Sequence, residues 1–219
     1  MSGVRFSGRL STTFNPFGDD FLADIMKATA TAWQRMKKPQ RNELEDAITR
    51  RLVGRIKNDP VFYNLPFDVD TQYWLLGLDG ETLGRLDVHF KHRHSKRDYF
   101  AFEAKRLRVR YPNGKSSTEY PAYVGDPGMM AFLEGQYADG LPTGGMLAYV
   151  MDGLTDKTWS GLTKRIEARR KPLRMAQSGT LMRSSLSSAV STTPGAHLGE
   201  TEHSLEKGQF RILHLILPV

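Results

Sequence analysis

Two neighbouring stretches of this chain alternate hydrophobic and polar residues, and each carries charged side chains in its middle. Residues 82–90 and 98–107 have the alternation that is typical of β-strands. Glu103 and Lys105 stand two residues apart, so in a strand they point to the same face of the sheet. If the two strands pair as a hairpin, Asp87 joins them. We therefore expect two carboxylates and one ammonium group to surround one point on a sheet.

Such a set of charges suits the hydrolysis of a phosphodiester bond. Carboxylate oxygens hold a divalent metal ion, and a neighbouring lysine can activate or orient a water molecule. A structural interpretation is open beside this one. In it, Glu103 and Lys105 form a charge pair on an edge strand, and Asp87 caps a turn.

The helix before these strands offers a third acidic ligand. The sequence predicts a helix over 41–58 that ends before Pro60. Glu45 falls within its apolar stripe, at about 100° from the first stripe residue, whereas Glu43 falls outside it. A buried carboxylate costs free energy unless it meets a cation or hydrogen-bond donors, so Glu45 is the first candidate ligand and Glu43 the second. The alternatives for Glu45 are that it reaches water or pairs with Arg41 one turn earlier. The stripe consists of Leu44, Ile48, Leu52 and Ile56.

The pattern along the chain predicts an α/β protein with a single domain over 1–219. A helical connection after the third strand indicates a crossover to a parallel fourth strand, in a mixed sheet with helices on both faces. The core takes up about 41–151, and 152–219 form a C-terminal extension with a polar loop and a last strand. The further expected elements are a helix from Asp19 or Asp20 to about 36, strands over 72–78, 146–151 and 210–217, a helix over 127–137, a basic helix or pair of helical turns over 158–175, and a loop over 178–208.

The composition is that of a soluble globular protein. With 219 residues, of which 39% are hydrophobic and 25% charged, the chain can bury one sizeable core. It contains no cysteine, which excludes disulfides and thiolate metal sites. The longest apolar run, 212–217, is too short to span a bilayer, and the N-terminus lacks the apolar stretch of a signal peptide. We therefore expect a cytoplasmic protein without a membrane partner.

The distribution of positive charge favours a polyanionic partner. The chain has 31 Lys and Arg against 24 Asp and Glu, a net charge of +7. Residues 91–115 hold nine of the basic residues and only two acidic ones, and 164–174 form a second basic stretch. Such clusters hold the phosphate backbone of nucleic acids, although the second stretch is equally consistent with a solvated helix face. The candidate phosphate contacts are Arg106, Arg108, Lys164, Arg165, Arg169 and Arg170.

The order of elements in the predicted core, together with its acidic residues, resembles the PD-(D/E)XK nuclease superfamily. The residues that carry the resemblance are Glu45, Asp87 and the run Glu103-Ala104-Lys105. The resemblance implies a restriction-endonuclease-like core, in which a helix, three strands, a helix and a further strand follow one another. It also implies that Asp87 and Glu103 bind Mg²⁺ or Mn²⁺, with the backbone carbonyl of Ala104 as an additional ligand. Glu45 would hold a second metal ion or a metal-bound water, and Lys105 would orient or deprotonate the attacking water.

The implied function is a metal-dependent nuclease that hydrolyses DNA, with RNA not excluded, in a restriction or anti-phage defence system. One alternative is a catalytically silent subunit that binds nucleic acid or acts as a scaffold. Another is a nuclease that is active only in complex with a protein partner. A homodimer is expected if both strands are cut, because they run antiparallel. Of the nearby side chains, we expect His89 to face the site, His92 and His94 to face phosphate or solvent, and Gln136 or Tyr137 either to touch the site or to lie at the surface.

Overall fold

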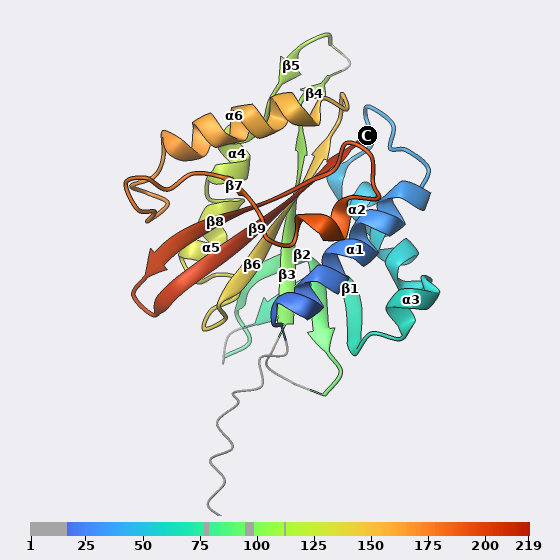
Figure 1. Cartoon of the computed structure of the whole chain (residues 1–219), viewed down its shortest axis with the longest axis horizontal. Helices are drawn as coiled ribbons and strands as arrows, with labels where there is room; N and C mark the ends of the chain where they lie inside the picture. The colour runs from blue at the N-terminus through green and yellow to red at the C-terminus, as the bar shows by residue number, and fades with distance from the viewer. Residues whose placement is uncertain (1–16, 77–78, 95–98, 112) are drawn as a thin grey trace, which may run out of the picture.

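The centre of the protein is a seven-stranded mixed β-sheet. The computed structural model describes residues 17–76, 79–94, 99–111 and 113–219. Helices cover both faces of the sheet (Figure 1), which confirms the predicted α/β class. In spatial order the strands are β1 (Phe67–Leu76), β2 (Thr82–His92), β3 (Tyr99–Leu107), β6 (Thr143–Val150), β9 (Gly208–Pro218), β8 (His197–Leu205) and β7 (Met182–Arg183). Two short strands, β4 (Val109–Arg110) and β5 (Ser116–Ser117), form a separate hairpin.

Parallel pairing occurs in the middle of the sheet and antiparallel pairing toward its edges. β3 is parallel to β6, and β6 is parallel to β9, whereas the other neighbouring strands are antiparallel. The predicted crossover to a parallel fourth strand is therefore confirmed. The connection holds two short helices, α4 (Tyr120–Val124) and α5 (Met129–Leu133), so the single helix expected over 127–137 is wrong. Gly128 is required between them, because a Cβ atom there would lie 2.1 Å from the backbone oxygen of Tyr123.

Two hydrophobic cores lie on opposite faces of the sheet, and β6 contributes to both. The other helices are α1 (Asp19–Arg35), α2 (Glu45–Lys57), α3 (Pro60–Tyr63), α6 (Thr155–Glu167) and the 3-10 helix η1 (Ser187–Val190). Leu147 and Tyr149 of β6 face the core formed with α1 and α2, and Met146 and Ala148 face the core formed with α4, α5 and α6. Trp33 of α1 stacks on Tyr149 with ring centroids 5.1 Å apart. Among the described residues, no helix is long and apolar enough to cross a membrane.

Helix α2 begins at Glu45, four residues later than the sequence indicates. Ile48, Leu52 and Ile56 are fully buried, as predicted. Leu44, however, precedes the helix and is 67% exposed, so it is not part of the buried stripe. Arg41 also lies outside the helix and does not stand one turn before Glu45, which pairs instead with Lys105.

The segment 178–208 contains a long strand, so the loop expected there is wrong. β8 pairs with β9 over its whole length, and β7 and η1 precede it. Thr201 and His203 of β8 are polar but fully buried, because their side chains form hydrogen bonds inside the fold. Polar residues on the buried face remove the hydrophobic alternation by which a strand is predicted.

The ends of two other elements also differ from those expected. α6 stops at Glu167, and the basic residues Arg169 and Arg170 lie in the turns that follow it. β1 starts at Phe67, five residues before the predicted strand. The predicted end of that strand at 77–78, and Asp98 at the start of the third strand, lie outside the described residues.

Candidate functional site

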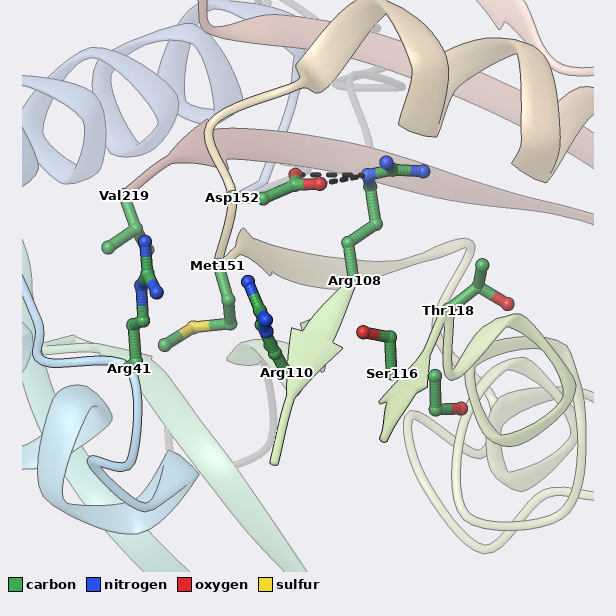
Figure 2. A pocket seen from close by; sticks show the side chains of 9 residues that line it. Arg41, Arg108, Arg110, Ser116, Thr118, Met151, Asp152 and Val219 are labelled. Carbon is green, nitrogen blue, oxygen red and sulfur yellow. Dashed lines mark hydrogen bonds and ion pairs between the residues drawn. The ribbon is translucent and has the colours of Figure 1, made fainter. Parts of the chain in front are cut away.

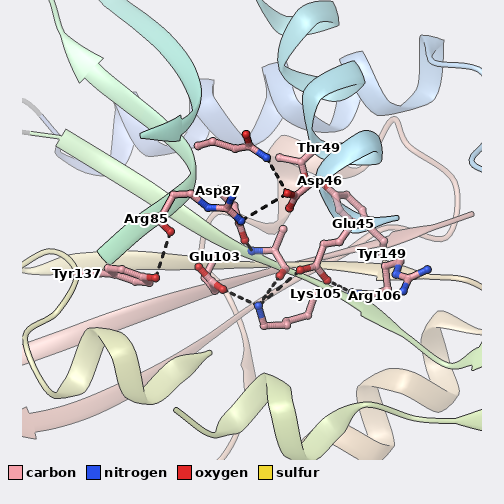
Figure 3. A network of polar contacts seen from close by, with 12 residues as sticks. Glu45, Asp46, Thr49, Arg85, Asp87, Glu103, Lys105, Arg106, Tyr137 and Tyr149 are labelled. Carbon is pink, nitrogen blue, oxygen red and sulfur yellow. Dashed lines mark hydrogen bonds and ion pairs between the residues drawn. The ribbon is translucent and has the colours of Figure 1, made fainter. Parts of the chain in front are cut away.

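The sheet opens between β2 and β3, and Asp87 lies at the opening. The two strands pair regularly from Lys91 and Tyr99 as far as Val88 and Phe102. Beyond that pair, Oδ2 of Asp87 accepts a hydrogen bond of 2.8 Å from the backbone N–H of Ala104 (Figure 3). The Asp87 carboxylate thus replaces the β2 backbone as the hydrogen-bond acceptor, because a buried N–H group needs an acceptor.

The carboxylate of Glu45 likewise accepts a hydrogen bond from a backbone N–H of β3, two residues beyond Ala104. As the first residue of α2, Glu45 reaches the strand, and its Oε2 accepts a 2.7 Å hydrogen bond from the backbone N–H of Arg106. The guanidinium of Arg106 donates to the backbone oxygen of Glu43 at 2.8 Å, which also ties this helix end to the strand. The Glu43 side chain pairs with Arg51 at 3.3 Å. Of the two candidate glutamates, Glu45 therefore has its carboxylate at the site.

The ammonium group of Lys105 lies among oxygen atoms. Its Nζ is 2.5 Å from Oε1 of Glu103, 2.9 Å from the backbone oxygen of Ala104 and 3.7 Å from Oε1 of Glu45. As the alternation along β3 predicts, Glu103 and Lys105 share a face, and the structure brings them together with Asp87 and Glu45 (Figure 3).

Burial and mutual repulsion raise the pKa values of these carboxyl groups. Asp87 is 7% exposed and Glu103 is 6% exposed. Burial, followed by the negative charge of Asp87, raises the pKa of Glu103 to about 8. Burial also raises the pKa of Asp87 and that of Glu45, against the opposing effects of their hydrogen bonds and of Lys105. For Lys105, burial alone would lower the pKa, but the carboxylates of Glu103 and Glu45 outweigh it and raise the pKa.

The donor atoms at this site suit a hard divalent cation. Three carboxylates and one ammonium group give the ionised cluster a net charge of −2, which a divalent ion would balance. Oε2 of Glu103 is buried and has no hydrogen-bond partner within the described part of the chain. Lys105, however, occupies the space between these oxygens, and among the described residues no group of three or more His, Cys, Asp or Glu side chains is arranged to hold a metal ion. The ammonium group of Lys105 thus already occupies Oε1 of Glu103, whereas Oε2 of Glu103 remains without a partner among the described residues.

A second layer of polar side chains surrounds the site, and most of it was not expected from the sequence. Asp46, next to Glu45, accepts a hydrogen bond from the side chain of Gln72 at 2.8 Å and pairs with Arg85 at 3.5 Å. The hydroxyl of Tyr137 donates to the backbone oxygen of Arg85 at 3.2 Å, so of the two alternatives left open for Tyr137 the structure shows the one beside the site. Arg85 precedes Asp87 by two residues and thus shares its face of β2, a signal that the sequence did contain.

His89 belongs to an aromatic stack. Its ring lies between those of Tyr73 and Tyr99, with centroid distances of 4.2 Å and 5.1 Å. Burial lowers its pKa to about 4, so the ring is neutral near pH 7. Gln136 is exposed at the surface.

The predicted phosphate contacts lie in different surroundings. Lys164 lines a shallow surface pocket together with Arg108, whereas Arg165 is half-buried. The guanidinium of Arg170 is bound by its own chain, since it donates to the backbone oxygen of Gly179 and pairs with Glu167 at 3.6 Å. Of the two alternatives for 158–175, a single basic helix is wrong, because α6 ends at Glu167 and Arg169 and Arg170 lie in the turns that follow.

The arrangement offers carboxylate oxygens to a cation and an ammonium group to an anion. These are the two charges that phosphoryl transfer needs near the reacting phosphorus. The same groups also satisfy backbone donors of β3, so they stabilise the opening of the sheet. No protein-family model, curated protein or solved structure was found to match this chain.

Proposed function

We propose that this protein is a metal-dependent nuclease with a restriction-endonuclease-like core, which hydrolyses phosphodiester bonds of DNA. The observation that carries the proposal is the convergence of Asp87, Glu103, Glu45 and Lys105 at the opening between β2 and β3. A carboxyl group with a pKa near 8 and an unpaired buried oxygen is costly for stability, and such groups concentrate at functional sites.

The order of elements supports the same proposal. Along the chain, α2 is followed by β1, β2, β3, the short helices α4 and α5, and β6, with α3 inserted before β1 and the hairpin of β4 and β5 inserted after β3. This is the order that the resemblance to PD-(D/E)XK nucleases implies for the core. The acidic residues also occupy the elements that the resemblance assigns to them, with Glu45 on the helix, Asp87 on the second strand and Glu103 on the third.

In this proposal each side chain has a distinct task. Asp87, Glu103, the backbone carbonyl of Ala104 and Glu45 would hold Mg²⁺ or Mn²⁺, which when bound supplies positive charge and polarises the scissile phosphate. Lys105 would leave the carboxylates, orient the attacking water and donate a hydrogen bond to the phosphate. Tyr137 would keep the backbone around Arg85 in place through its hydroxyl.

A second candidate function is a catalytically silent subunit that binds nucleic acid. The observation in its favour is that the carboxylates already have partners within the fold: Asp87 and Glu45 accept backbone N–H groups, and Glu103 pairs with Lys105. The proposal of a nuclease extends to three further points. The protein would act in a defence system, a partner would activate it, and it would form a homodimer.

The experiment is cleavage of supercoiled plasmid, labelled single-stranded DNA and labelled RNA, each with Mg²⁺, Mn²⁺ or a chelator. Wild type is compared with Lys105→Ala and Asp87→Asn, and with the matched surface variants Lys91→Ala and Asp70→Asn. Metal-dependent cleavage that is lost in the first two variants and kept in the last two supports the proposal. Cleavage that persists in both site variants overturns it. Binding of nucleic acid that is equal with metal and chelator, without any cleavage, supports the silent subunit.

A further inference from the structure

A second polar pocket lies beyond the end of β3 (Figure 2). Its volume is about 560 Å³, which is large enough for a nucleotide. Three arginines, Arg41, Arg108 and Arg110, contribute to its wall, together with the hydroxyl groups of Ser116 and Thr118. None of these side chains belongs to the carboxylate site described above.

The backbone forces the arginines to converge. Val109 of β4 is buried in the core, so the alternation of a strand makes the neighbouring Arg110 point away from it. Arg108 has a φ of 57°, a left-handed conformation that non-glycine residues rarely adopt and that is often found at functional sites. Arg41 lies just before α2 and completes the pocket from the opposite side.

Two of the guanidinium groups remain available for a ligand. Asp152 accepts hydrogen bonds from Nε of Arg108 at 2.9 Å and 2.8 Å, and the hydroxyl of Tyr120 also interacts with this guanidinium. Arg41 and Arg110 form neither an ion pair nor a side-chain hydrogen bond with any residue that the structure describes. Arg41 and Arg110 thus present unpaired cationic donors to the pocket, which is the arrangement by which proteins bind phosphate.

The charge and the donor groups of the pocket indicate which phosphate fits. The lining side chains, three guanidinium groups and the carboxylate of Asp152, add up to +2, and the main-chain carboxylate of Val219, which also lines the pocket, lowers the total to +1. A phosphate monoester carries nearly two negative charges at pH 7, because its second pKa is about 6. A phosphodiester of a nucleic-acid backbone carries only one. The pocket is net positive, and a terminal phosphate offers its guanidinium groups three free acceptor oxygens, whereas an internal phosphodiester offers two.

We propose that this pocket binds a terminal phosphate monoester, that of a nucleotide either free or at the end of a nucleic-acid strand. Arg108 follows Lys105 by three residues, so the pocket begins about 10 Å along the chain from the carboxylate site. A strand held by its end phosphate would then pass the carboxylates with its first nucleotides. That last step rests on the proposed nuclease function, whereas binding of the monoester does not.

The test measures binding in the presence of a chelator, so that it is independent of cleavage. Full-length protein is titrated into short oligothymidylates with a phosphate or a hydroxyl at the 5′ end and, separately, at the 3′ end, each labelled at the other end for fluorescence anisotropy. Adenosine 5′-monophosphate and adenosine form the matching free pair, measured by calorimetry. The variants are Arg110→Ala and Arg41→Ala, whose side chains have no partner to lose, with Arg183→Ala on the far edge strand β7 as the control.

We expect the phosphorylated member of at least one pair to bind at least about tenfold more tightly, the effect of one charge-assisted hydrogen bond. Arg110→Ala and Arg41→Ala remove this difference, and Arg183→Ala keeps it. The pair that shows the difference identifies the source, a strand end or a free nucleotide. Equal affinity for both members of every pair overturns the proposal, as does a difference that survives in both pocket variants. Neither result depends on whether the carboxylate site cleaves DNA.

Discussion

The carboxylate of Asp87 accepts a 2.8 Å hydrogen bond from the backbone N–H of Ala104, across the point where β2 and β3 separate. Glu45 accepts the N–H of Arg106 two residues further along the same strand. These two amides would face the neighbouring strand in an unbroken sheet, so the carboxylates replace a missing run of backbone acceptors. The acidic residues thus have a structural role as well as the proposed chemical one, and the variants below separate the two.

Replacement of Glu103 by glutamine should stabilise the protein at alkaline pH. The folded pKa of Glu103, about 8, is raised above its unfolded value of 4.5, so the folded state holds the proton more tightly. Its contribution to the free energy of unfolding is complete below pH 4.5 and is lost as the pH rises through 8. We expect Glu103→Gln to exceed wild type by about 1 kcal/mol or more at pH 9, or roughly 2–4 °C in Tm, and to gain less at pH 5.

The measurement is thermal unfolding in a chelator at pH 5 and at pH 9. Glu202→Gln, on the exposed side of β8, serves as the control for loss of a carboxylate in general. Parallel stability profiles for wild type and Glu103→Gln would contradict the raised pKa.

Replacement of Lys105 by methionine should destabilise the protein and make it more responsive to Mg²⁺. The variant leaves three carboxylates with no ammonium group among them, and breaking a buried pair costs roughly 3 kcal/mol. A divalent ion can then take the vacated position between the same oxygens. We expect the rise in Tm on addition of Mg²⁺ to be larger in Lys105→Met than in wild type at pH 8. Lys91→Met should respond as wild type does, and an equal rise in all three proteins would contradict a cation site.

The sequence predicted the centre of the site well and its surroundings poorly. Alternation along a hydrophobic strand predicts that Glu103 and Lys105 share a face, and the pairing of β2 with β3 adds Asp87. Glu45 was found because a carboxylate inside an apolar stripe needs a partner. The pairing of Asp46 with Arg85 depends instead on how α2 packs against β2, and no local pattern encodes that contact.

The elements that the sequence missed are those whose buried residues are polar or whose helices are short. β8 buries Thr201 and His203 through hydrogen bonds, so its hydrophobic pattern is broken. α4 and α5 have five residues each, fewer than two turns, and periodicity over so short a span carries little information. Gly128 falls inside the single helix expected over 127–137, whereas the structure requires it between α4 and α5 because of a backbone contact.

A chain of buried hydrogen bonds fixes the tautomers of two histidines. The backbone oxygen of Leu173 can only accept, so Nδ1 of His203 carries a proton and donates to it at 2.7 Å. The hydroxyl of Thr201 then donates to Nε2 of His203 at 2.7 Å and accepts from Nε2 of His214 at 2.9 Å. Tyr123 donates to Nδ1 of His214 at 2.9 Å. We expect long-range ¹H–¹⁵N NMR to show the Nδ1–H tautomer for His203 and the Nε2–H tautomer for His214, and the reverse assignment would contradict this network.

The same histidines should make the protein less stable in acid. Burial lowers the pKa of His203 to about 4 and that of His214 to about 3, both below the unfolded value of 6.5. The unfolded state therefore binds more protons, and the free energy of unfolding falls as the pH drops from about 6.5 to about 4. Thr201→Val removes the central hydroxyl and should cost about 2 kcal/mol at pH 7. Urea unfolding between pH 4 and pH 7 tests the pH effect, and NMR signals assigned to His203 and His214 that titrate near pH 6.5 in the folded protein would contradict it.

Two substitutions of Glu45 separate its structural role from its charge. Glu45→Gln keeps an oxygen that can accept the N–H of Arg106, whereas Glu45→Ala leaves that amide without a side-chain acceptor and loosens the start of α2. We expect the alanine variant to lose about 2 kcal/mol in the free energy of unfolding and the glutamine variant to lose less, because a hydrogen bond to a charged group is worth about 1.5–3 kcal/mol.

The affinity for the metal should depend on the negative charge of Glu45 and not on its hydrogen bond with the N–H of Arg106. Both variants remove one of the three carboxylates, so both should bind Mg²⁺ or Mn²⁺ more weakly than wild type, as measured by calorimetry, although only Glu45→Ala is clearly destabilised. Glu43→Gln is the matched control, because the Glu43 side chain pairs with Arg51 and lies outside the site. If the glutamine variant binds the metal as tightly as wild type, Glu45 serves only to hold α2 against β3.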